Sequence, residues 1–301
     1  MLDMAAWADD QGFAYVDFGE HHVTESGYNP SPLVTCAAVA GRTHNIRMRP
    51  NVLLAPFYNP VRLAEDTAVL SLVAGGRFDL VLGGGYRQRE CDLYGTSLKD
   101  RWKTVGDTAR FLRQAWTGEP FEYRGQDIAI RPAPDPPPAL FLGGYSEAAA
   151  RRAARIADGF SPPYIEGLWE FFRDERIKRG HPDPGAAQPL GPVFLWVSDN
   201  TEDAWDMLMP HLLSQVAEYQ QFMTETYGGD EHIPYQRMPT TEEMRQNAVN
   251  QVLTPEETIA LAEKLGNRGV LYLNPLMDGI APQEAWRMLR LFETKVLPYL
   301  P

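Results

Sequence analysis

The sequence predicts an α/β fold in which a parallel β-sheet is covered by helices. Short apolar segments with strand composition alternate with amphipathic segments of helical period along the 301 residues. Such alternation is typical of parallel sheets, whose strands are joined by crossover helices. Because the pattern never reverses, we expect a (β/α)8 TIM barrel rather than an open sheet.

The expected strands are bounded by glycine, proline and polar turns. They are residues 13–18, 46–54, 78–82, 140–142, 160–161, 193–197 and 270–273. Pro50 falls inside the second strand, and proline in a central strand predicts a bulge there. A (β/α)8 barrel needs one strand more, and the chain opens on a helix over residues 2–11. We therefore expect that a first strand, upstream of Met1, is missing from this chain.

Capping signals mark the expected helices. Pro60 suits the first turn of a helix, and Thr254 to Glu257 form a capping box around Pro255. The helices are expected at residues 31–42, 60–72, 100–116, 147–157, 166–178, 201–223 with an interruption near Pro210, 255–266 and 282–295. A small hairpin is expected within the proline-rich segment 118–138.

Residues 224–252 are polar and poorly periodic. Long segments of this kind in compact domains are usually lids or disordered. We expect a mobile lid or a substrate-specificity insertion here, with a disordered segment as the alternative. The chain otherwise reads as a single domain over residues 1–301.

Composition restricts the class of partner. The net charge is −12 and no run of Lys or Arg occurs, which argues against a nucleic-acid partner. No apolar run approaches the length of a membrane span, and the first residues lack signal-peptide features. Cys36 and Cys91 form neither a disulfide framework nor a zinc motif. We expect a cytoplasmic protein without a nucleic-acid or membrane partner.

Two adjacent histidines follow the first expected strand. His21 and His22 lie at its carboxyl end, the edge where parallel barrels carry their active sites. Successive side chains of an extended segment point opposite ways, so we expect one of them to face the barrel mouth. Histidine suits general acid–base catalysis. The alternatives are loop residues bonded to the backbone, or metal ligands, although no third ligand is obvious. Glu20 is expected to be a structural acceptor.

Two glycine-rich segments also follow expected strands. Gly143, Gly144, Tyr145 and Ser146 lead into a helix, whose first N–H groups and dipole suit a phosphate; an ordinary helix cap is the alternative. The helix residues Arg151 and Arg152 are expected to be solvated. Gly83 and Gly84 would let a flat ring or a phosphate approach the backbone, with a flexible turn as the alternative. Neither segment is a GxGxxG dinucleotide motif.

An ordered set of motifs resembles the bacterial luciferase-like monooxygenase family. The motifs are Gly12-Phe13, Glu20-His21-His22, Gly41-Arg42-Thr43, residues 59–66 (NPVRLAED), Gly76-Arg77-Phe78 and residues 292–300. These enzymes are TIM-barrel oxidoreductases that depend on a flavin or a deazaflavin. The resemblance covers essentially the whole chain, and the family normally begins with a strand upstream of the position of Met1.

The resemblance implies roles for individual residues. His21 matches the histidine of luciferase-type catalysis, and Ser146 matches a serine that contacts the FMN phosphate. Asn51 would bond the polar edge of the flavin ring, and Ser161 would border it. Gly84 replaces a basic phosphate contact of some relatives, and Arg87 or Arg89 would compensate.

The resemblance also implies an activity. Reduced FMN, supplied by a separate flavin reductase, would react with molecular oxygen to oxidise a small organic substrate, in a protein that is a homodimer, as many relatives are. One alternative is hydride transfer with a reduced deazaflavin coenzyme. The other is a non-catalytic flavoprotein-like subunit, against which the retained His21 argues.

Overall fold

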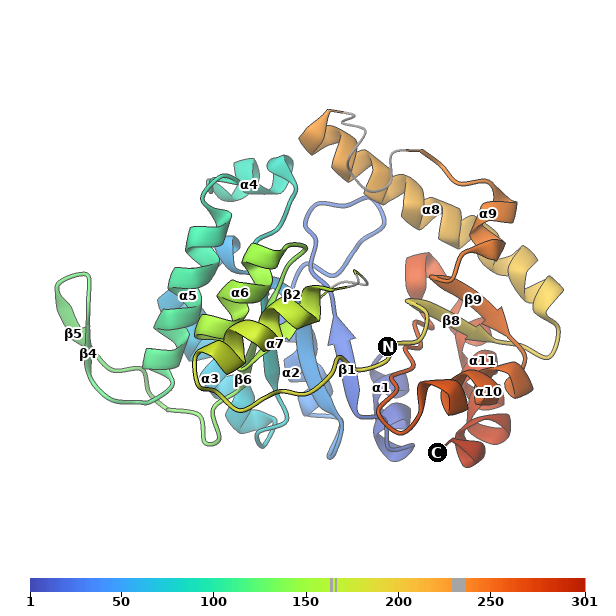
Figure 1. Ribbon diagram of the computed structural model, residues 1–301, viewed down its shortest axis with the longest axis horizontal. Coiled ribbons are helices and arrows are strands. Elements are labelled where there is room, and N and C mark those ends of the chain that lie inside the picture. Colours follow the sequence, from blue (N-terminus) through green and yellow to red (C-terminus); the bar gives the residue numbers. More distant parts are fainter. Residues whose placement is uncertain (163–164, 166, 229–236, 301) are drawn as a thin grey trace. The chain divides into compact units, whose positions relative to one another are not determined.

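The computed structural model describes residues 1–162, 165, 167–228 and 237–300. The chain divides into two compact units, Met1–Ala186 and Ala187–Pro301 (Figure 1). The prediction of a single domain stays a prediction. Within the described ranges, the helices are all too short or too polar to cross a membrane.

The first unit is built on a five-stranded sheet of order β1-β2-β3-β6-β7. Its strands are Tyr15–Phe18 (β1), Arg47–Leu54 (β2), Asp79–Gly83 (β3), Ala139–Gly143 (β6) and Gly159–Ser161 (β7). Every neighbouring pair is parallel, so all five carboxyl ends share one edge of the sheet. The expected strands of this half are confirmed. In the described part of the chain β1 pairs with β2 alone, and the missing upstream strand stays a prediction.

Helices bury one face of this sheet. They are Leu2–Asp10 (α1), Pro32–Ala40 (α2), Pro60–Val73 (α3), Arg101–Ala115 (α5), Glu147–Ile156 (α6) and Leu168–Lys178 (α7), whereas Gln88–Tyr94 (α4) lies at the carboxyl edge beside the histidines. Alternate strand residues such as Met48, Leu80 and Leu140 form the core with apolar residues of these helices. The expected hairpin is confirmed as Phe121–Tyr123 (β4) against Gln126–Ile128 (β5). The short helix α4 was not expected.

The other face of the sheet is polar. Arg47 bonds Asp79 through two contacts of 2.9 and 2.6 Å, and Arg49 bonds Asp17 through contacts of 2.8 and 3.0 Å. The predicted bulge near Pro50 is confirmed, because the register between β2 and β3 shifts between Asn51 and Leu53. The Asn51–Val52 peptide at this point is cis.

The second unit contains a shorter parallel pair. Its elements are Phe194–Val197 (β8), Thr201–Tyr227 (α8), Thr241–Gln246 (α9), Asn250–Leu253 (β9), Pro255–Leu265 (α10) and Pro282–Lys295 (α11). β8 pairs with β9. The strand expected at residues 270–273 is wrong, since Val270 and Leu273 form only isolated bridges. The expected interruption of α8 is also wrong: the helix continues through Pro210, because Leu208, Met209 and Leu212 are buried on both sides of it.

Residues 224–252, expected to be a lid or an insertion, carry regular structure at both ends. Residues 224–227 complete α8, and α9 begins at a capping box between Thr240 and Glu243. β9 was missed because its first residues, Asn250 and Gln251, are polar. Residues 229–236 lie outside the described residues, and the lid stays a prediction.

Val52 fills the space between the ends of two neighbouring strands. A Cβ atom added to Gly83 of β3 would lie 2.4 Å from Cγ2 of Val52, and one added to Gly143 of β6 would lie 2.8 Å from Cγ1. A side chain at either position would therefore collide with Val52. These two glycines are needed for packing, whether or not a ligand approaches them.

We predict that Gly83→Ala lowers the free energy of unfolding by about 1–3 kcal/mol, because the added methyl group overpacks this contact. Val52→Ala removes the colliding methyl groups, so the double variant should lose less stability than the sum of the two single variants. Urea unfolding gives the free energy of unfolding of the unchanged protein, the two single variants and the double variant.

Gly41→Ala is the matched control. Gly41 has a φ of −73° at the end of α2, and the nearest atoms to its added Cβ lie at 3.8 Å. This substitution should change the stability by less than about 1 kcal/mol. If the losses of unfolding free energy from Gly83→Ala and Val52→Ala simply add in the double variant, the packing role of Val52 is contradicted.

Candidate active site

The two histidines lie buried at the carboxyl edge of the first unit's sheet, directly after β1. His21 is 7% exposed and His22 is 6% exposed. Each imidazole ring contacts a glutamate through one nitrogen and a tyrosine hydroxyl through the other. The expectation that one of the two rings faces the barrel mouth stays a prediction. The two rings use their nitrogens in opposite order, which gives them different properties.

His21 lies between Glu90 and Tyr86. Its Nδ1 atom is 3.0 Å from Oε1 of Glu90, and its Nε2 atom is 3.2 Å from the hydroxyl of Tyr86. The edge of the ring also meets the rings of Tyr28 and Tyr86, with centroids 4.9 and 5.4 Å away. The imidazole is thus held in one orientation by contacts on several sides.

Glu90 of α4 sets the tautomer of His21. Burial by itself would raise the pKa of Glu90, but the hydrogen bond from His21, the N–H of His22 at 2.9 Å and the guanidinium of Arg87 outweigh it and lower that pKa. An ionised carboxylate only accepts hydrogen bonds, so Nδ1 of His21 carries the hydrogen. Nε2 then accepts from Tyr86, whose own pKa is raised, mainly by burial, so that the phenol keeps its proton.

His22 is held differently. Its Nε2 atom is 3.0 Å from Oε1 of Glu20, and its Nδ1 atom is 2.8 Å from the hydroxyl of Tyr94. Glu20 also accepts the N–H of Leu54 at 2.6 Å and the hydroxyl of Tyr58 at 2.7 Å. Glu20 is therefore the structural acceptor that was expected, and it ties the end of β1 to the end of β2.

Arg87 was expected to compensate for Gly84, and the structure places it beside the two histidines; its contact with a phosphate stays a prediction. This guanidinium is buried, with 1% of the residue exposed, and it bonds the carbonyl of His22 at 3.1 Å and Glu90 at 3.3 Å. Arg87 thus supports the histidine pair. Arg89 is exposed. The sequence prediction missed Tyr86 and Glu90, although both follow β3 at the edge where His21 lies.

Asn51 and Ser161 come together across the sheet. The hydroxyl of Ser161 donates to Oδ1 of Asn51 at 3.2 Å, and the amide of Asn51 donates to Asp17 at 3.1 Å. Their strands β2 and β7 are separated by β3 and β6. In a flat sheet the two strands would be roughly 14 Å apart. The contact therefore requires a sheet curled toward its polar face, as barrels require.

Gly144, Tyr145 and Ser146 lead from β6 into α6. The Ser146 hydroxyl caps the helix by accepting the N–H of Ala149 at 3.3 Å. A Cβ atom on Gly144 would lie 2.4 Å from that of Ala149, so only glycine permits this close turn. Tyr145 is 69% exposed. The predicted helix amino terminus is present, and contact of these residues and of Gly83, Gly84 and Gly143 with a cofactor stays a prediction.

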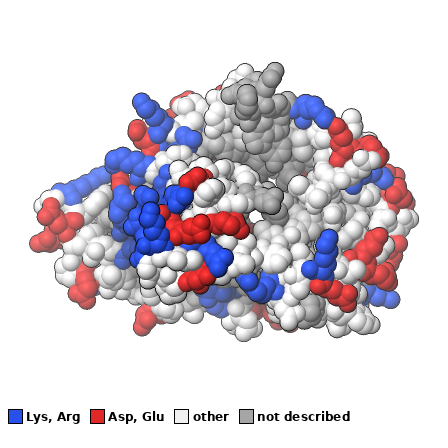
Figure 2. Space-filling model, in the orientation of Figure 1, with Lys and Arg blue, Asp and Glu red and all other residues white. Residues whose placement is uncertain are grey.

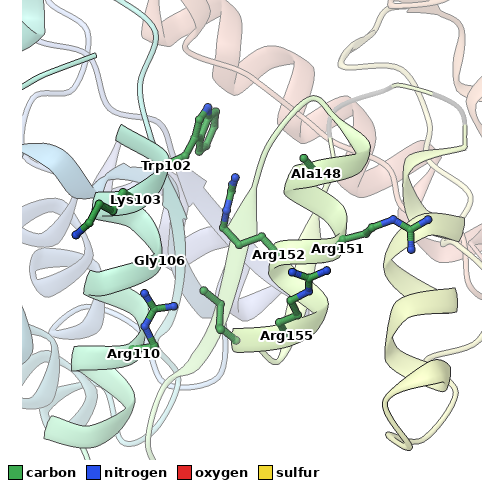
Figure 3. Close-up of a pocket in the computed structure, with 9 residues that line it drawn as sticks. Trp102, Lys103, Gly106, Arg110, Ala148, Arg151, Arg152 and Arg155 are labelled. Atoms are coloured by element: carbon green, nitrogen blue, oxygen red, sulfur yellow. The ribbon is translucent and has the colours of Figure 1, made fainter. Parts of the chain in front are cut away.

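A basic cleft of about 520 Å³ lies between α5 and α6 (Figure 3). It is lined by Trp102, Lys103, Gly106, Arg110, Ala148, Arg151, Arg152, Arg155 and Ile156. Figure 2 shows Lys and Arg side chains gathered over this region. Gly84 adjoins it, because a Cβ atom there would lie 3.0 Å from the Trp102 ring. The cleft therefore reaches the edge of the sheet that carries the histidines.

Most of the cleft's cations already have acidic partners. Lys103 and Arg110 share Asp107. Arg151 and Arg155 contact Glu175, whose pKa is lowered to about 2 by hydrogen bonds from Arg179 and Arg155. These pairs offset only part of the positive charge of the four residues.

Arg152 is different. It points from α6 toward Trp102, with its guanidinium carbon 5.0 Å from the ring centroid (Figure 3). Burial lowers its pKa, and within the described residues it forms no ion pair. The expectation that Arg152 is solvated is wrong, because the Trp102 ring covers it. A half-buried cation without an acidic partner is a favourable contact for an anion.

No metal site accompanies the histidines in the described ranges. Groups of three or more His, Cys, Asp or Glu side chains placed to hold an ion do not occur there. The acids beside His21 and His22 are instead occupied by the backbone, tyrosine and arginine contacts described above.

Comparison with known proteins agrees with this architecture. The chain is 27% identical over 187 residues to an F420-dependent glucose-6-phosphate dehydrogenase of Amycolatopsis mediterranei, spanning 58% of this chain and 56% of that one. It is 24% identical over 238 residues to 4-hydroxyprotoasukamycin monooxygenase of Streptomyces nodosus subsp. asukaensis, spanning 72% of this chain and 64% of that one. The matched segments thus cover less than two thirds of these relatives.

A solved structure shows the fold. The oxygenating constituent of 3,6-diketocamphane monooxygenase of Pseudomonas putida, in complex with FMN, superposes with a TM-score of 0.76 at 20% identity, over 100% of this chain and 92% of that one. The chain accordingly has the α/β luciferase-like TIM-barrel fold. Residues 1–269 match the family model described as luciferase-like monooxygenase. By this match, the chain belongs to the luciferase-like monooxygenase family.

Proposed function

We propose that this protein is a monooxygenase that uses reduced FMN and molecular oxygen to oxidise a small organic substrate. The observation that carries the proposal is the placement of an oriented, buried His21 on the same sheet edge as the amino terminus of α6, which is suited to an anion. Parallel strands bring both to this edge, because one follows β1 and the other follows β6. Active sites of such barrels lie at this edge.

The residues near α6 fit a phosphate group. Ser146 offers a hydroxyl at the helix amino terminus, where N–H groups and the helix dipole favour an anion. Arg152 offers a half-buried guanidinium without an acidic partner among the described residues. Asn51 and Ser161 present polar atoms on the curled face of the sheet, where the edge of a flavin ring would be held. Bound reduced FMN would supply the electrons for reduction of oxygen.

A reduced deazaflavin coenzyme is the second candidate. The F420-dependent glucose-6-phosphate dehydrogenase of Amycolatopsis mediterranei supports it as a relative, and the same basic cleft would accept a phosphodiester. The reaction would then be hydride transfer without oxygen. Anaerobic titration with each reduced cofactor, followed by exposure to oxygen, separates the candidates. A protein that binds neither cofactor would contradict both and would favour a non-catalytic subunit.

The proposal includes the partners expected from the resemblance. These are a separate flavin reductase, molecular oxygen, a small-molecule substrate and a second copy of the chain. A cytoplasmic location is included as well, and it suits Cys36 and Cys91, which are both free and buried.

We predict that Arg152→Gln reduces the preference of the protein for FMN over riboflavin. The two ligands differ by the phosphate, and loss of one charged hydrogen bond should lower the affinity for FMN about 10- to 100-fold. The affinity for riboflavin should stay the same. Fluorescence titration with both ligands measures the ratio.

Lys178→Gln is the matched control for this measurement. Lys178 is exposed at the end of α7 and lies outside the cleft. Its removal changes the net charge equally, so the preference for FMN should persist. Equal losses in the two variants would show only a long-range effect of charge and would contradict the phosphate contact.

We predict that His21→Asn slows oxidation of the bound reduced cofactor by oxygen, in the presence of substrate, by roughly 100-fold or more, because general acid–base catalysis is lost. Stopped-flow absorbance measures this rate. Cofactor affinity and thermal unfolding should stay close to those of the unchanged protein. An unchanged rate would favour the non-catalytic subunit.

A further inference from the structure

We propose that Tyr86, His21 and Glu90 form a proton relay in which Tyr86 contacts the ligand, His21 stores the proton and Glu90 fixes the imidazole. The inference rests on the proposed function for its reaction. Its hydrogen-bonded geometry is a property of the chain alone and is tested without a cofactor.

The position of the Tyr86 hydroxyl on Nε2 of His21 favours Tyr86 as the contact group. His21 is buried, with 7% of the residue exposed, and the hydroxyl of Tyr86 occupies its Nε2 atom at 3.2 Å. Tyr86 itself is only half-buried, and it follows Gly85, whose positive φ of 68° turns the chain at the end of β3. Because this hydroxyl already occupies Nε2, a ligand would exchange a proton with the imidazole through the phenol.

The relay moves one proton equivalent from the ligand to His21 along two hydrogen bonds. An acidic X–H group of the ligand gives its proton to the oxygen of Tyr86, while the phenolic O–H gives its own proton to Nε2 of His21. The ligand is left as the conjugate base, Tyr86 is again a phenol, and His21 becomes an imidazolium. The reverse order returns the proton. No electrons are exchanged with the protein, and no co-reactant is needed.

Glu90 is the positioning residue of the relay. Its Oε1 atom receives Nδ1–H of His21, the N–H of His22 and the guanidinium of Arg87, whereas its buried Oε2 atom receives no hydrogen bond from the described residues. All of the carboxylate's donors thus converge on the oxygen that faces His21. An imidazolium formed there would lie 3.0 Å from a carboxylate oxygen, which stabilises the charge.

The neighbouring histidine provides an internal comparison. His22 also lies between a glutamate and a tyrosine, but Glu20 is anchored to the backbone of β2 through Leu54 and also accepts from Tyr58. Tyr94 lies on α4 and contacts the ring of Phe57, with centroids 4.5 Å apart. We assign this second trio a structural role only.

The first experiment compares Tyr86→Phe with Tyr94→Phe in the full chain. Each variant loses one hydroxyl bonded to one histidine. Tyr86→Phe should slow oxidation of the bound reduced cofactor roughly 100-fold, as expected for a lost proton-transfer group, with cofactor affinity unchanged. Tyr94→Phe should keep the rate within a factor of about three. Equal rates in the two variants would overturn the role of Tyr86.

The second experiment uses nitrogen-15 NMR of the histidine rings without cofactor. His21, assigned by its loss in His21→Asn, should appear as the single tautomer with hydrogen on Nδ1. Glu90→Gln should give a mixture of tautomers, because an amide both donates and accepts, and His22 should keep its signals. A single, unchanged tautomer in Glu90→Gln would overturn the positioning role.

Two possible failures, of the folding of Glu90→Gln and of the proposed function, can be distinguished from failure of the relay. If Glu90→Gln fails to fold, Glu90→Asp takes its place, because it keeps the negative charge opposite Arg87 but moves the carboxylate away from His21. His21 should then show the same mixture of tautomers. An unchanged tautomer would overturn the positioning role of Glu90. If the protein binds neither reduced cofactor, the proposed function fails, while the NMR spectra still decide whether Glu90 holds His21 as described.

Discussion

The structure of the candidate site depends on two buried carboxylates and the donors that surround them. Burying a charge costs several kcal/mol unless hydrogen bonds and counter-charges replace the lost water. Glu20 is hydrogen-bonded by Leu54, Tyr58 and His22. Glu90 is hydrogen-bonded by both histidines and Arg87. Each carboxylate joins elements that are distant in sequence. The end of β1 is thereby fixed to β2 and to α4, which orients the imidazole of His21.

The two faces of the five-stranded sheet differ in the side chains that they carry. One face is buried under helices through residues such as Met48 and Leu80. The other carries the ion pairs of Asp17 and Asp79 and the contact between Asn51 and Ser161. Val52 enters the space left by glycines at the ends of β3 and β6. A curled sheet with small residues at its edge leaves polar atoms accessible beside the histidines.

Charge is distributed unevenly over this acidic chain. The net charge is −12, yet five Lys and Arg residues line one cleft. Asp107, Glu147 and Glu175 partly offset the charge of four of them, whereas Arg152 forms no ion pair within the described residues and lies on α6, whose amino terminus also favours an anion. An acidic surface elsewhere disfavours nonspecific binding of polyanions.

The sequence by itself determined the parallel α/β pattern, the bulge near Pro50, the helix cap at Ser146 and the place of His21 at a strand end. These features depend on local periodicity, proline geometry and capping residues, all of which are visible over a few positions. Only the tertiary structure decided that Glu90 reaches His21 across 69 residues and that Arg152 is covered by Trp102. It also decided that the polar segment Asn250–Leu253 pairs with β8. Burial and pairing depend on contacts between distant segments, and no local pattern encodes them.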